Sequence, residues 1–484
     1  MSSVGLDAVA FHVPKLALDL GGEWAEARYR ALGESSVESL VSKITKGIGS
    51  RRIGIPDAHE DTATMAAMAA KRLIDRTGID PRDIGWLGIG TETTVDQSKS
   101  LGAYVLGMLE RHYGVSMSHV SCPQFQFACI GATLALESAV NLMWAGRSRR
   151  PYALVIASDV SKYAMFSHAE YTQGAGAAAM LLSRNPKLLA FDARPFATHT
   201  CDERDFFRPN WRTEAIVDGK HSINVYLRCV QRALAEYVSE YERQSGRRFD
   251  EQADFDYLLM HLPFPRMGEY AATRLWRVLR DRSLLDPRSD VDEQRERELD
   301  REAARDPAFL RFFGQSCEDG LAFSRETGNA YSASLYLGLC SLLSHLARAR
   351  TDVAGRRVLF CSYGSGASAS VFGAEFVDGC QQGARIVDQV ESLAPAQAGG
   401  SRQLVTLEQY ERLHRSQSLT LDQAEAGVGA SHRLNQDTLL EARPAQPQAS
   451  VRPPSSEFAL KRIGTRAEGP GCDLGYRYYE YVTR

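Results

Sequence analysis

Residues 121–146 read SCPQFQFACIGATLALESAVNLMWAG and decide the fold. Residues 124–128 have the pattern of an extended segment, and residues 131–145 carry apolar side chains at helical spacing before Gly146. Cys129 therefore falls where a strand turns into a helix. The free N–H groups and the dipole of a helix start favour a thiolate, so we expect a lowered pKa and a nucleophilic thiol at Cys129. The alternative is a small buried residue that packs a tight junction.

The same alternation continues along the chain, where short β-rich runs bounded by Gly, Pro or Asp alternate with helical patterns. This alternation predicts an α/β protein whose sheets are covered by helices. The expected strands are residues 85–90, 153–158, 177–182, 188–193, 257–262, 358–362 and 368–376. The expected helices are residues 61–77, 99–113, 129–145, 222–244, 266–280 and 329–348.

Composition excludes several classes of protein. The chain has 484 residues, 44% of them hydrophobic, with 57 Lys and Arg residues against 60 Asp and Glu residues. This balance, a net charge of -3, is typical of a soluble globular protein and argues against nucleic-acid binding. No apolar run approaches the roughly 18 residues of a membrane-spanning helix, and the N-terminus lacks the pattern of a secretion signal. We therefore expect a cytoplasmic protein without a membrane partner.

The cysteines predict reduced thiols and no metal centre. There are 9 of them, an odd number, and no pair is spaced CxxC. No HExxH occurs either, so the specific zinc patterns are missing from the sequence. If a cysteine has a function here, we expect it to act singly.

Glu92 and His261 each follow an apolar run that is expected to be a strand. In GWLGIGTETTVDQSKS, residues 85–100, Glu92 comes directly after the strand, where α/β proteins often hold an acid or base. In DYLLMHLPFPRMGEY, residues 256–270, His261 closes the strand and can donate a hydrogen bond to a substrate carbonyl. The alternatives are a solvated loop glutamate and a histidine satisfied within the core.

Glycine-containing segments supply two further candidate site residues and one motif that does not fit its usual context. Asn329 in ETGNAYSASLYLGLCSLL stands at a helix start, either as a plain N-cap or as an amide donor to a bound carbonyl. In LFCSYGSGASASV, the turn around Ser365 either holds an oxyanion with its backbone N–H groups or simply connects two strands. Residues 174–179, GAGAAA, match a loose dinucleotide motif, but a strand-like run follows instead of a helix. We expect no dinucleotide there.

Two segments differ in amino-acid composition from the rest of the chain. Residues 280–307 alternate acids and arginines, which predicts a solvated helix with i,i+4 ion pairs. Residues 444–456 form a linker rich in Pro, Ser and Gln. Beyond the linker, residues 458–463 and a group of tyrosines have strand character, so we expect the C-terminus to dock on the body of the protein. These tyrosines are Tyr476, Tyr478, Tyr479 and Tyr481.

A collinear series of stretches covers residues 46–380 nearly without a gap. In chain order these are KGIGSRRIGI, GTETTVDQSKS, FACIGAT, ALVIASDVSKY, AEYTQGAGAAAML, RDFFRPNWRTEAIVDGKHS, HLPFPRM, ETGNAYSASLYLGLCSLL and CSYGSG. The series resembles the HMG-CoA synthase family of the thiolase superfamily, and it is far more specific than any single motif. It favours the functional interpretation of Cys129, Glu92 and His261 over the plain one.

The resemblance implies an acyltransferase that joins an acetyl group to the ketone of a 3-oxoacyl thioester. It implies the thiolase-like five-layer αβαβα fold, made of two similar halves that we place at residues 1–185 and 186–484. It further implies a homodimer whose active site lies at the end of a narrow tunnel for a pantetheine arm. The substrates would be acyl-CoA thioesters, and no organic cofactor or metal would take part.

The resemblance also implies roles for particular residues. Cys129 would carry the acetyl group, Glu92 would remove a proton from its methyl carbon, and His261 would bind the carbonyl of the acceptor. Backbone N–H groups of Cys129 and of the Ser365 turn would stabilise the oxyanion, and water would finally hydrolyse the thioester. The substrate-binding set would be Asn329, Ser365, Thr172, Tyr331, Phe206 and Arg266.

Two departures from the family's pattern keep a second substrate class open. Ile130 stands where the family usually has an aromatic residue, and Arg266 stands where a lysine is often found. The first expectation is acetoacetyl-CoA as acceptor and HMG-CoA as product. The alternative is β-branching in polyketide synthesis, with acyl groups on acyl carrier protein. Two other classes of protein fit the sequence less well. A ketoacyl synthase III usually has the motif HQAN where this chain has HLPF. An inactive scaffold of the same fold would be expected to lose Cys129 or Glu92, and both residues are present.

Overall fold

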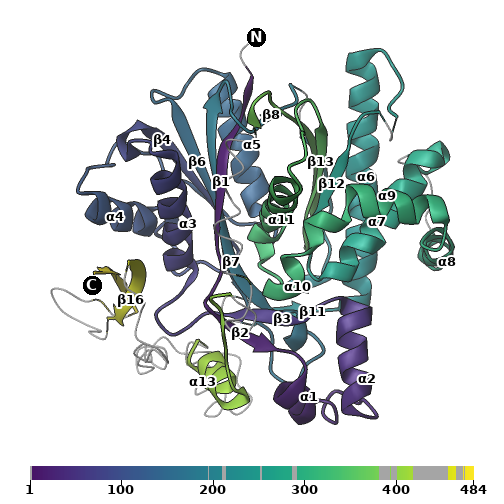
Figure 1. The fold of residues 1–484 in the computed structure, drawn as a ribbon, viewed down its shortest axis with the longest axis horizontal. Coiled ribbons are helices and arrows are strands. Elements are labelled where there is room, and N and C mark those ends of the chain that lie inside the picture. Colours follow the sequence, from purple (N-terminus) through teal and green to yellow (C-terminus); the bar gives the residue numbers. More distant parts are fainter. Residues whose placement is uncertain are drawn as a thin grey trace.

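Helices and sheets are stacked in five layers, which Figure 1 shows from left to right. The layers are α3 (Thr62–Thr77) with α4 (Leu101–Tyr113), a first sheet, α5 (Gly131–Trp144) with α11 (Ser334–Ala349), a second sheet, and α6 (Gly219–Ser245) with α7 (Pro265–Arg280). The computed structural model describes residues 3–193, 196–209, 214–250, 253–285, 292–380, 393, 400–417, 456–464, 473 and 475–483. The expected αβαβα architecture is confirmed.

The two sheets share one strand order and one set of strand directions. The first runs β1-β7-β6-β4-β5 and the second β8-β14-β13-β12. In both, the first two pairings are antiparallel and the third is parallel, which confirms two similar halves. The division at residue 185 stays a prediction. The strands are β1 (Val4–His12), β4 (Ile84–Gly90), β5 (Gln124–Phe125), β6 (Tyr152–Ser161), β7 (Gly174–Arg184), β8 (Leu189–Phe191), β12 (Tyr257–Met260), β13 (Arg357–Gly364) and β14 (Ser368–Phe376).

The two sheets meet where β1 pairs with β8. Gly5 lies opposite Ala190 in this short antiparallel contact. A Cβ atom on Gly5 would stand 1.8 Å from the carbonyl oxygen of Leu189, so only glycine allows the two backbones to approach. One ladder of hydrogen bonds therefore runs through both halves.

Each sheet is covered on both faces, as β7 illustrates. Along β7, Ala179 and Leu181 belong to the core shared with α3 and α4, whereas Met180 and Leu182 belong to the central core shared with α5 and α11. A strand buried on both faces has no polar side, which explains its continuous apolar sequence. The dinucleotide-like residues 174–179 lie inside this strand, so they do not precede a helix.

The structure adds one central strand that the sequence pattern did not indicate. β1 is buried along its whole length although it contains Asp7 and ends at His12. Both polar side chains have buried partners, since Ser183 donates to Asp7 and His12 hydrogen-bonds to Glu60 at 3.2 Å. These partners come from distant segments, so only the folded chain shows that the strand can be central.

The charged segment forms α8 (Glu293–Ala303), and its expected solvation is wrong in part. Glu296 and Asp300 are one helical turn apart and face α7, where Arg274 and Arg277 present their guanidinium groups. The Arg274 Nη2 atom lies 2.6 Å from the Asp300 Oδ2 atom, and Arg277 pairs with both acids. Ion pairs between two helices therefore add to the ion pairing within α8.

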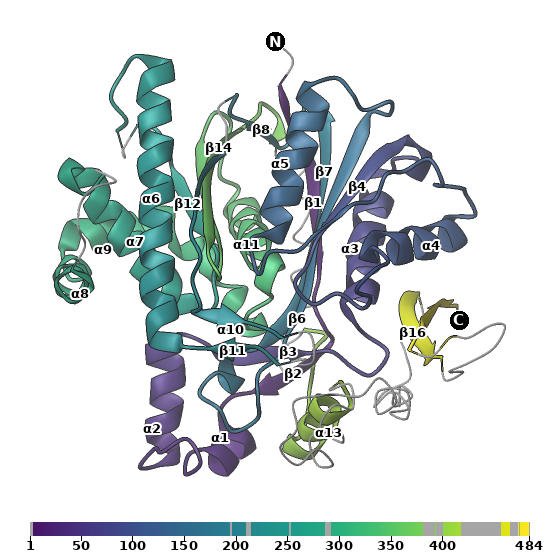
Figure 2. The same ribbon diagram turned by 180° about the vertical axis from the view of Figure 1, so that it is seen from behind.

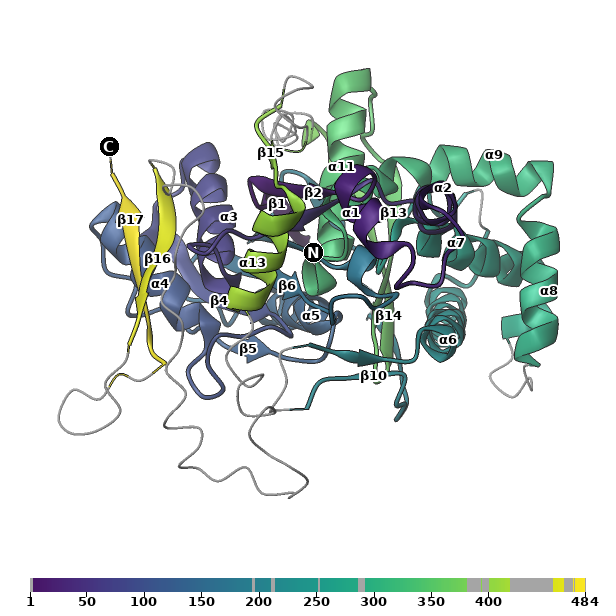
Figure 3. The same cartoon turned by 90° about the horizontal axis from the view of Figure 1, so that it is seen from below.

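The C-terminal residues form a hairpin against α3 and α4 (Figure 3). Its strands are β16 (Glu457–Ile463) and β17 (Arg477–Val482). Phe458 is 2% exposed and belongs to the core shared with α3 and α4. Asp61, the N-cap of α3, accepts hydrogen bonds from Arg477 at 2.7 Å and from Tyr479 at 2.9 Å. Of the expected linker, residues 444–455 lie outside the described residues.

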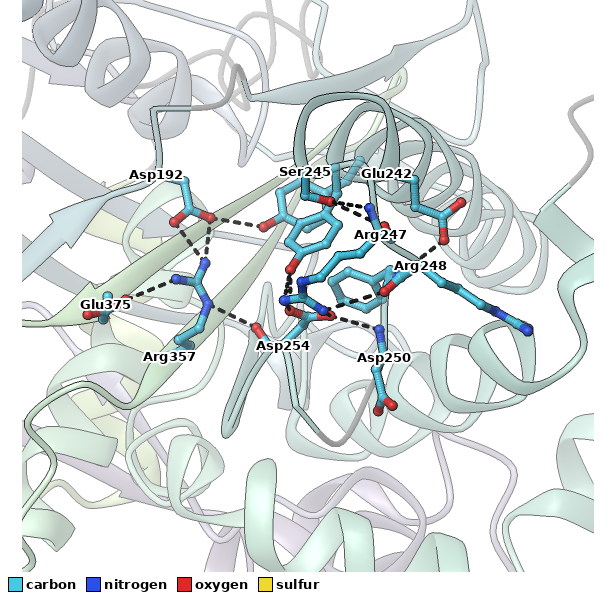
Figure 4. A network of polar contacts seen from close by, with 12 residues as sticks. Asp192, Glu242, Ser245, Arg247, Arg248, Asp250, Asp254, Arg357 and Glu375 are labelled. Atoms are coloured by element: carbon cyan, nitrogen blue, oxygen red, sulfur yellow. Dashed lines mark hydrogen bonds and ion pairs between the residues drawn. The ribbon is translucent and has the colours of Figure 1, made fainter.

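Figure 2 shows α6 lying along the face of β12 and β14, and Figure 4 shows how polar contacts fix its outer end. The Arg357 guanidinium donates to both carboxylate oxygens of Asp192 at 2.7 Å. Arg357 also donates to the backbone oxygen of Asp254 at 3.0 Å, and Asp254 pairs with Arg247 just beyond α6. The network ties the end of α6 to the second sheet.

The remaining elements mostly build the end of the molecule where the first sheet's parallel strands terminate. They are β2 (Leu16–Asp19), α1 (Gly22–Arg28), α2 (Val37–Ser42), β3 (Arg52–Ile55), β9 (Ala197–Thr200), β10 (Phe206–Phe207), β11 (Ile216–Val217), α9 (Pro307–Ser316), α10 (Ser324–Thr327), β15 (Gln403–Leu404) and α13 (Leu407–Gln417). Within the described ranges, no helix combines the length and the apolar character needed to cross a bilayer.

Candidate active site

Cys129 lies at the predicted junction between β5 and α5. The residue before it, Ala128, has a φ of 39°, so the chain turns sharply there and presents the next side chain. Gly90, at the end of β4, packs against the start of α5, where a Cβ atom would stand 2.1 Å from the backbone nitrogen of Ala132. This close approach brings the loop after β4 next to Cys129.

Glu92 contacts Cys129. The Cys129 Sγ atom lies 3.9 Å from the Glu92 Oε2 atom and donates to it. Glu92 is 7% exposed, so the alternative of a solvated loop glutamate is wrong. A half-buried thiol and a buried carboxylate thus meet at this point.

Arg208, in the loop after β10, holds the other side of Glu92. Its Nη2 atom donates to the Glu92 Oε1 atom at 2.7 Å, and its Nη1 atom donates to the Glu92 backbone oxygen at 2.6 Å. Arg208 was not among the predicted site residues, although it lies in RDFFRPNW, one of the stretches that resemble the family. An arginine in a loop has no pattern that identifies its partner.

The charges of this group differ from the sequence expectation. Burial raises the pKa of Glu92 to about 7, although the charge of Arg208 acts in the opposite direction. Burial, assisted by the charges of Glu92 and Asp159, raises the pKa of the Cys129 thiol well above its ordinary value. The expected lowering by the helix start is therefore wrong, because desolvation and two nearby carboxylates outweigh it. The raised pKa favours the protonated thiol beside Glu92 at neutral pH.

Asp159 in β6 fixes the backbone that carries Glu92. Its Oδ1 atom accepts hydrogen bonds from the Thr91 hydroxyl at 2.7 Å and from the Glu92 N–H at 2.9 Å. Its Oδ2 atom accepts from the Ser332 N–H at 2.9 Å, so one carboxylate joins both halves. The sequence did carry a signal for Asp159, because it lies toward the carboxyl end of the strand that neighbours β4.

Three aromatic rings form a wall beside Cys129. Cys129 packs against the cluster that contains Tyr163, Tyr331 and Phe206. The ring centroids of Tyr163 and Tyr331 are 6.3 Å apart, and those of Phe206 and Tyr331 are 6.0 Å apart, both edge to face. The predicted substrate-binding residues Tyr331 and Phe206 are therefore beside the thiol, and Tyr163 is an addition that the sequence analysis missed.

His261 directly follows β12, as predicted. Its backbone N–H donates to the Cys361 oxygen at 2.9 Å, and its backbone oxygen accepts from the Tyr226 hydroxyl at 2.9 Å. Its ring lies 6.3 Å from that of Tyr226 and 6.5 Å from that of Tyr363. Burial lowers the pKa of His261 to about 3, so the imidazole is neutral and keeps one N–H donor.

Asn329 closes the turn that leads into α11. Its Oδ1 atom accepts from the Tyr331 N–H at 2.8 Å, and its own N–H donates to the Thr172 oxygen at 3.0 Å. The Thr172 hydroxyl donates to the Ala169 oxygen at 2.8 Å. Asn329 is thus not a helix N-cap, because Ala330 and Ala333 are the N-caps of residues 331–333 and of α11, and the carbonyl end of its amide closes a two-residue turn instead. The segment also links Thr172 to the Tyr331 turn beside Cys129.

The Ser365 turn packs against the peptide that carries Cys129. A Cβ atom on Gly364 would lie 2.8 Å from the Ile130 nitrogen and 2.9 Å from the Phe127 oxygen, which explains the glycine. Arg266 has a different position: it lies in the first turn of α7, pairs with Glu269, and has a side chain that is 37% exposed. Arg266 therefore forms its ion pair with Glu269 at the surface and not with Glu92.

A half-buried thiol and a buried carboxylate at the meeting point of two similar α/β halves define an acyltransferase of the thiolase-like fold. The family models named Hydroxymethylglutaryl-coenzyme A synthase N terminal and C terminal match residues 34–187 and 189–436. The hydroxymethylglutaryl-CoA synthase of Haloferax volcanii is 34% identical over 430 residues, which cover 86% of this chain and 92% of that protein. The chain belongs to the hydroxymethylglutaryl-CoA synthase family.

Solved structures agree with this assignment. The structure of MvaS in complex with 3-hydroxy-3-methylglutaryl coenzyme A is 29% identical and superposes with a TM-score of 0.77, with 100% of both chains covered. The curacin pathway HMG synthase in complex with holo donor-ACP has a TM-score of 0.70 at 23% identity, with 99% of this chain and 100% of that chain covered. The second likeness shows a shared fold.

Proposed function

We propose that the protein condenses an acetyl group with the ketone of acetoacetyl-CoA and releases HMG-CoA and CoA. The observation that carries this proposal is the contact of 3.9 Å between the Cys129 thiol and the Glu92 carboxylate. A thiol supplies the covalent carrier, and a carboxyl group whose pKa is about 7 serves as an acid and a base near neutral pH. The chemistry requires no organic cofactor, because both substrates are already activated as thioesters.

The first step is acetyl transfer to Cys129. The thiol passes its proton to Glu92 while the sulfur attacks the carbonyl carbon of acetyl-CoA. The tetrahedral oxyanion is stabilised by backbone N–H groups of Cys129 and of the Ser365 turn, each worth roughly 10²- to 10³-fold in rate. The intermediate collapses to acetyl-Cys129, and the CoA thiolate takes up a proton as it leaves.

The second step forms the carbon–carbon bond. Glu92 removes a proton from the acetyl methyl group, and the resulting enolate attacks the ketone carbon of the acceptor. The neutral imidazole of His261 and the Nδ2 group of Asn329 donate to the carbonyl oxygens of the acceptor, and the alkoxide that forms takes up the proton that Glu92 removed. Asn329 can do so because its own turn engages only Oδ1. Water then hydrolyses the thioester to Cys129 and completes the turnover.

The remaining site residues shape the cavity for the acyl groups and the pantetheine arm. Tyr331 and Phe206 form its apolar wall beside Cys129. Thr172 holds the Asn329 backbone. Arg266, on the surface at the start of α7, is suited to the negatively charged end of a carrier. We also propose that the protein is cytoplasmic and forms a homodimer. Sedimentation velocity tests the dimer, because it reports the mass of the particle in solution.

The alternative is polyketide β-branching, in which one or both acyl groups are carried by acyl carrier protein. It is supported by the fold likeness to the curacin HMG synthase and by the departures at Ile130 and Arg266. The hydroxymethylglutaryl-CoA synthase of Haloferax volcanii is more similar in sequence, at 34% identity, which favours CoA.

Intact-mass measurement separates the two substrates. The protein is incubated in parallel with acetyl-CoA and with acetyl carrier protein, and the acetyl adduct is timed by mass spectrometry. We expect rapid labelling by acetyl-CoA, no labelling of Cys129→Ala, and HMG-CoA after acetoacetyl-CoA is added. Labelling by the carrier protein alone would support β-branching. An adduct that forms equally in Cys129→Ala would contradict both.

A further inference from the structure

A group of three potential metal ligands lies away from Cys129, between β9 and α6. Within the described parts of the chain, His199, Cys201 and Cys229 are the only set of at least three His, Cys, Asp or Glu residues whose ligand atoms converge. Their ligand atoms all lie within 4.8 Å of one another. The Cys201 and Cys229 sulfur atoms are 3.7 Å apart, and both thiols are free. The group has no part in the acyl transfer proposed above.

The local structure brings these side chains together. His199 lies in β9 and Cys201 directly follows it, so the two are two residues apart and point to one side of the extended segment. That side faces α6, which carries Cys229. The segment is held in place, because His199 pairs with Ala369 of β14 and the Cys201 N–H donates to the Ala367 oxygen at 3.0 Å. The ligand positions are therefore set by two rigid elements.

The distance between the Cys201 and Cys229 sulfur atoms matches one edge of a tetrahedral metal site. A zinc ion binds thiolate sulfur at about 2.3 Å, so two thiolates on a tetrahedral ion are about 3.8 Å apart. The observed 3.7 Å agrees with this edge. A disulfide would need the sulfurs at about 2.05 Å, so the pair as it stands has the spacing of two metal ligands rather than of a bond.

The charges around the group are compatible with a cation. Arg228 and Arg232 carry the positive charges that act on His199. Arg228 is itself paired with Glu203 and, at 2.8 Å, with Glu293. The two acids offset its charge near the sulfurs.

We propose that His199, Cys201 and Cys229 bind one thiophilic divalent cation of the zinc type. Both thiols lose their protons on binding, so two protons are released for each ion and the thiolates neutralise its charge. Three protein ligands leave a fourth position for water. The ion would fasten β9 to α6, and through the pairing of Cys201 with Ala367 it would stiffen the turn that follows Ser365.

Cobalt(II) is the probe for this site, because its thiolate complexes absorb light and zinc complexes do not. The full-length protein, reduced and freed of metal, is titrated with Co²⁺, and the thiolate-to-cobalt charge-transfer band and the visible d–d bands are recorded. We expect saturation at one ion per chain and full displacement of the bands by one equivalent of Zn²⁺. The melting temperature should rise on addition of Zn²⁺.

Variants identify the ligands. Cys201→Ser and His199→Ala change half-buried side chains, so they should fold, and each should lose the thiolate band or shift saturation to far higher Co²⁺. Cys122→Ser, which removes another half-buried thiol, and Cys129→Ser should both keep the bands unchanged. The proposal is overturned if wild type shows no thiolate band, if Cys201→Ser keeps it, or if Cys129→Ser abolishes it.

Discussion

Arg208 grips Glu92 at two points, since one guanidinium nitrogen donates to the carboxylate at 2.7 Å and another to the backbone oxygen of the same residue at 2.6 Å. The second carboxylate oxygen of Glu92 faces Cys129. The guanidinium charge of Arg208 therefore favours the carboxylate form of Glu92, whereas burial raises the pKa of Glu92 to about 7. This balance makes Arg208 the residue whose removal should change the pH profile most directly.

Arg208→Gln is expected to move the acidic limb of the pH–rate profile for condensation to higher pH by about one pH unit or more. The positive charge of Arg208 lowers the pKa of Glu92, so its loss raises that pKa and delays the formation of the carboxylate as pH rises. The measurement is the single-turnover rate of condensation from pH 5 to 9. Arg208→Lys, which keeps the charge, should stay close to wild type. An unchanged limb in Arg208→Gln would show that Glu92 is not the titrating base.

Glu92→Gln is expected to lower the condensation step by at least ~10²-fold and to reduce acetylation far less. Glutamine cannot take the methyl proton. It also removes the negative charge that raises the pKa of Cys129, which partly compensates for the missing base in the first step. Adduct formation by intact mass and HMG-CoA formation report the two steps separately. Equal losses in both steps would contradict this prediction, and Glu92→Asp serves as the control that keeps a carboxylate.

His261→Ala is expected to raise the KM for the 3-oxoacyl substrate and to lower condensation, with a smaller effect on acetyl transfer. The reason is that His261 is neutral and acts as a hydrogen-bond donor, since burial lowers its pKa to about 3. His261→Gln, which keeps a donor, should recover part of the rate. Steady-state kinetics with varied acceptor measures this. Loss of acetylation with normal acceptor binding would instead make His261 the base for the thiol.

Phe458→Ala is expected to destabilise the protein by about 3 to 5 kcal/mol, the usual cost of emptying a buried aromatic site. Phe458 is 2% exposed and packs in the core with α3 and α4. Tyr476→Ala in the same hairpin is the control, because Tyr476 is 39% exposed and its loss should cost less than about 1 kcal/mol. Urea unfolding followed by circular dichroism gives both values.

Removal of all residues after Ser456 should lower the melting temperature by more than Phe458→Ala does. The truncation also removes the contacts of Arg477 and Tyr479 with Asp61, the N-cap of α3. Differential scanning calorimetry of the truncated chain tests this. An unchanged melting temperature would show that the hairpin is dispensable.

The sequence by itself determined the position of Cys129 and the kind of chain around it. Residues 124–145 contain the extended run and the helical periodicity that put Cys129 at a junction, and the apolar run before Glu92 put a carboxylate at a strand end. These features are local, because they depend on side chains that are neighbours along the chain. The collinear series of stretches then gave the family, which no single motif would have given.

Only the tertiary structure decided what surrounds these residues. Arg208 comes from a different segment from Asp159 and Tyr163, and the partners of these residues are set by the packing of two halves. The pKa of Cys129 illustrates the difference: the helix start is visible in the sequence and favours a thiolate, but burial and two carboxylates act together to raise the pKa. Desolvation depends on every atom that excludes water from a site, so it is a property of the folded chain. The pairing of Cys201 with Cys229 has the same origin, because the distance between a strand and a helix is fixed only when both pack on one core.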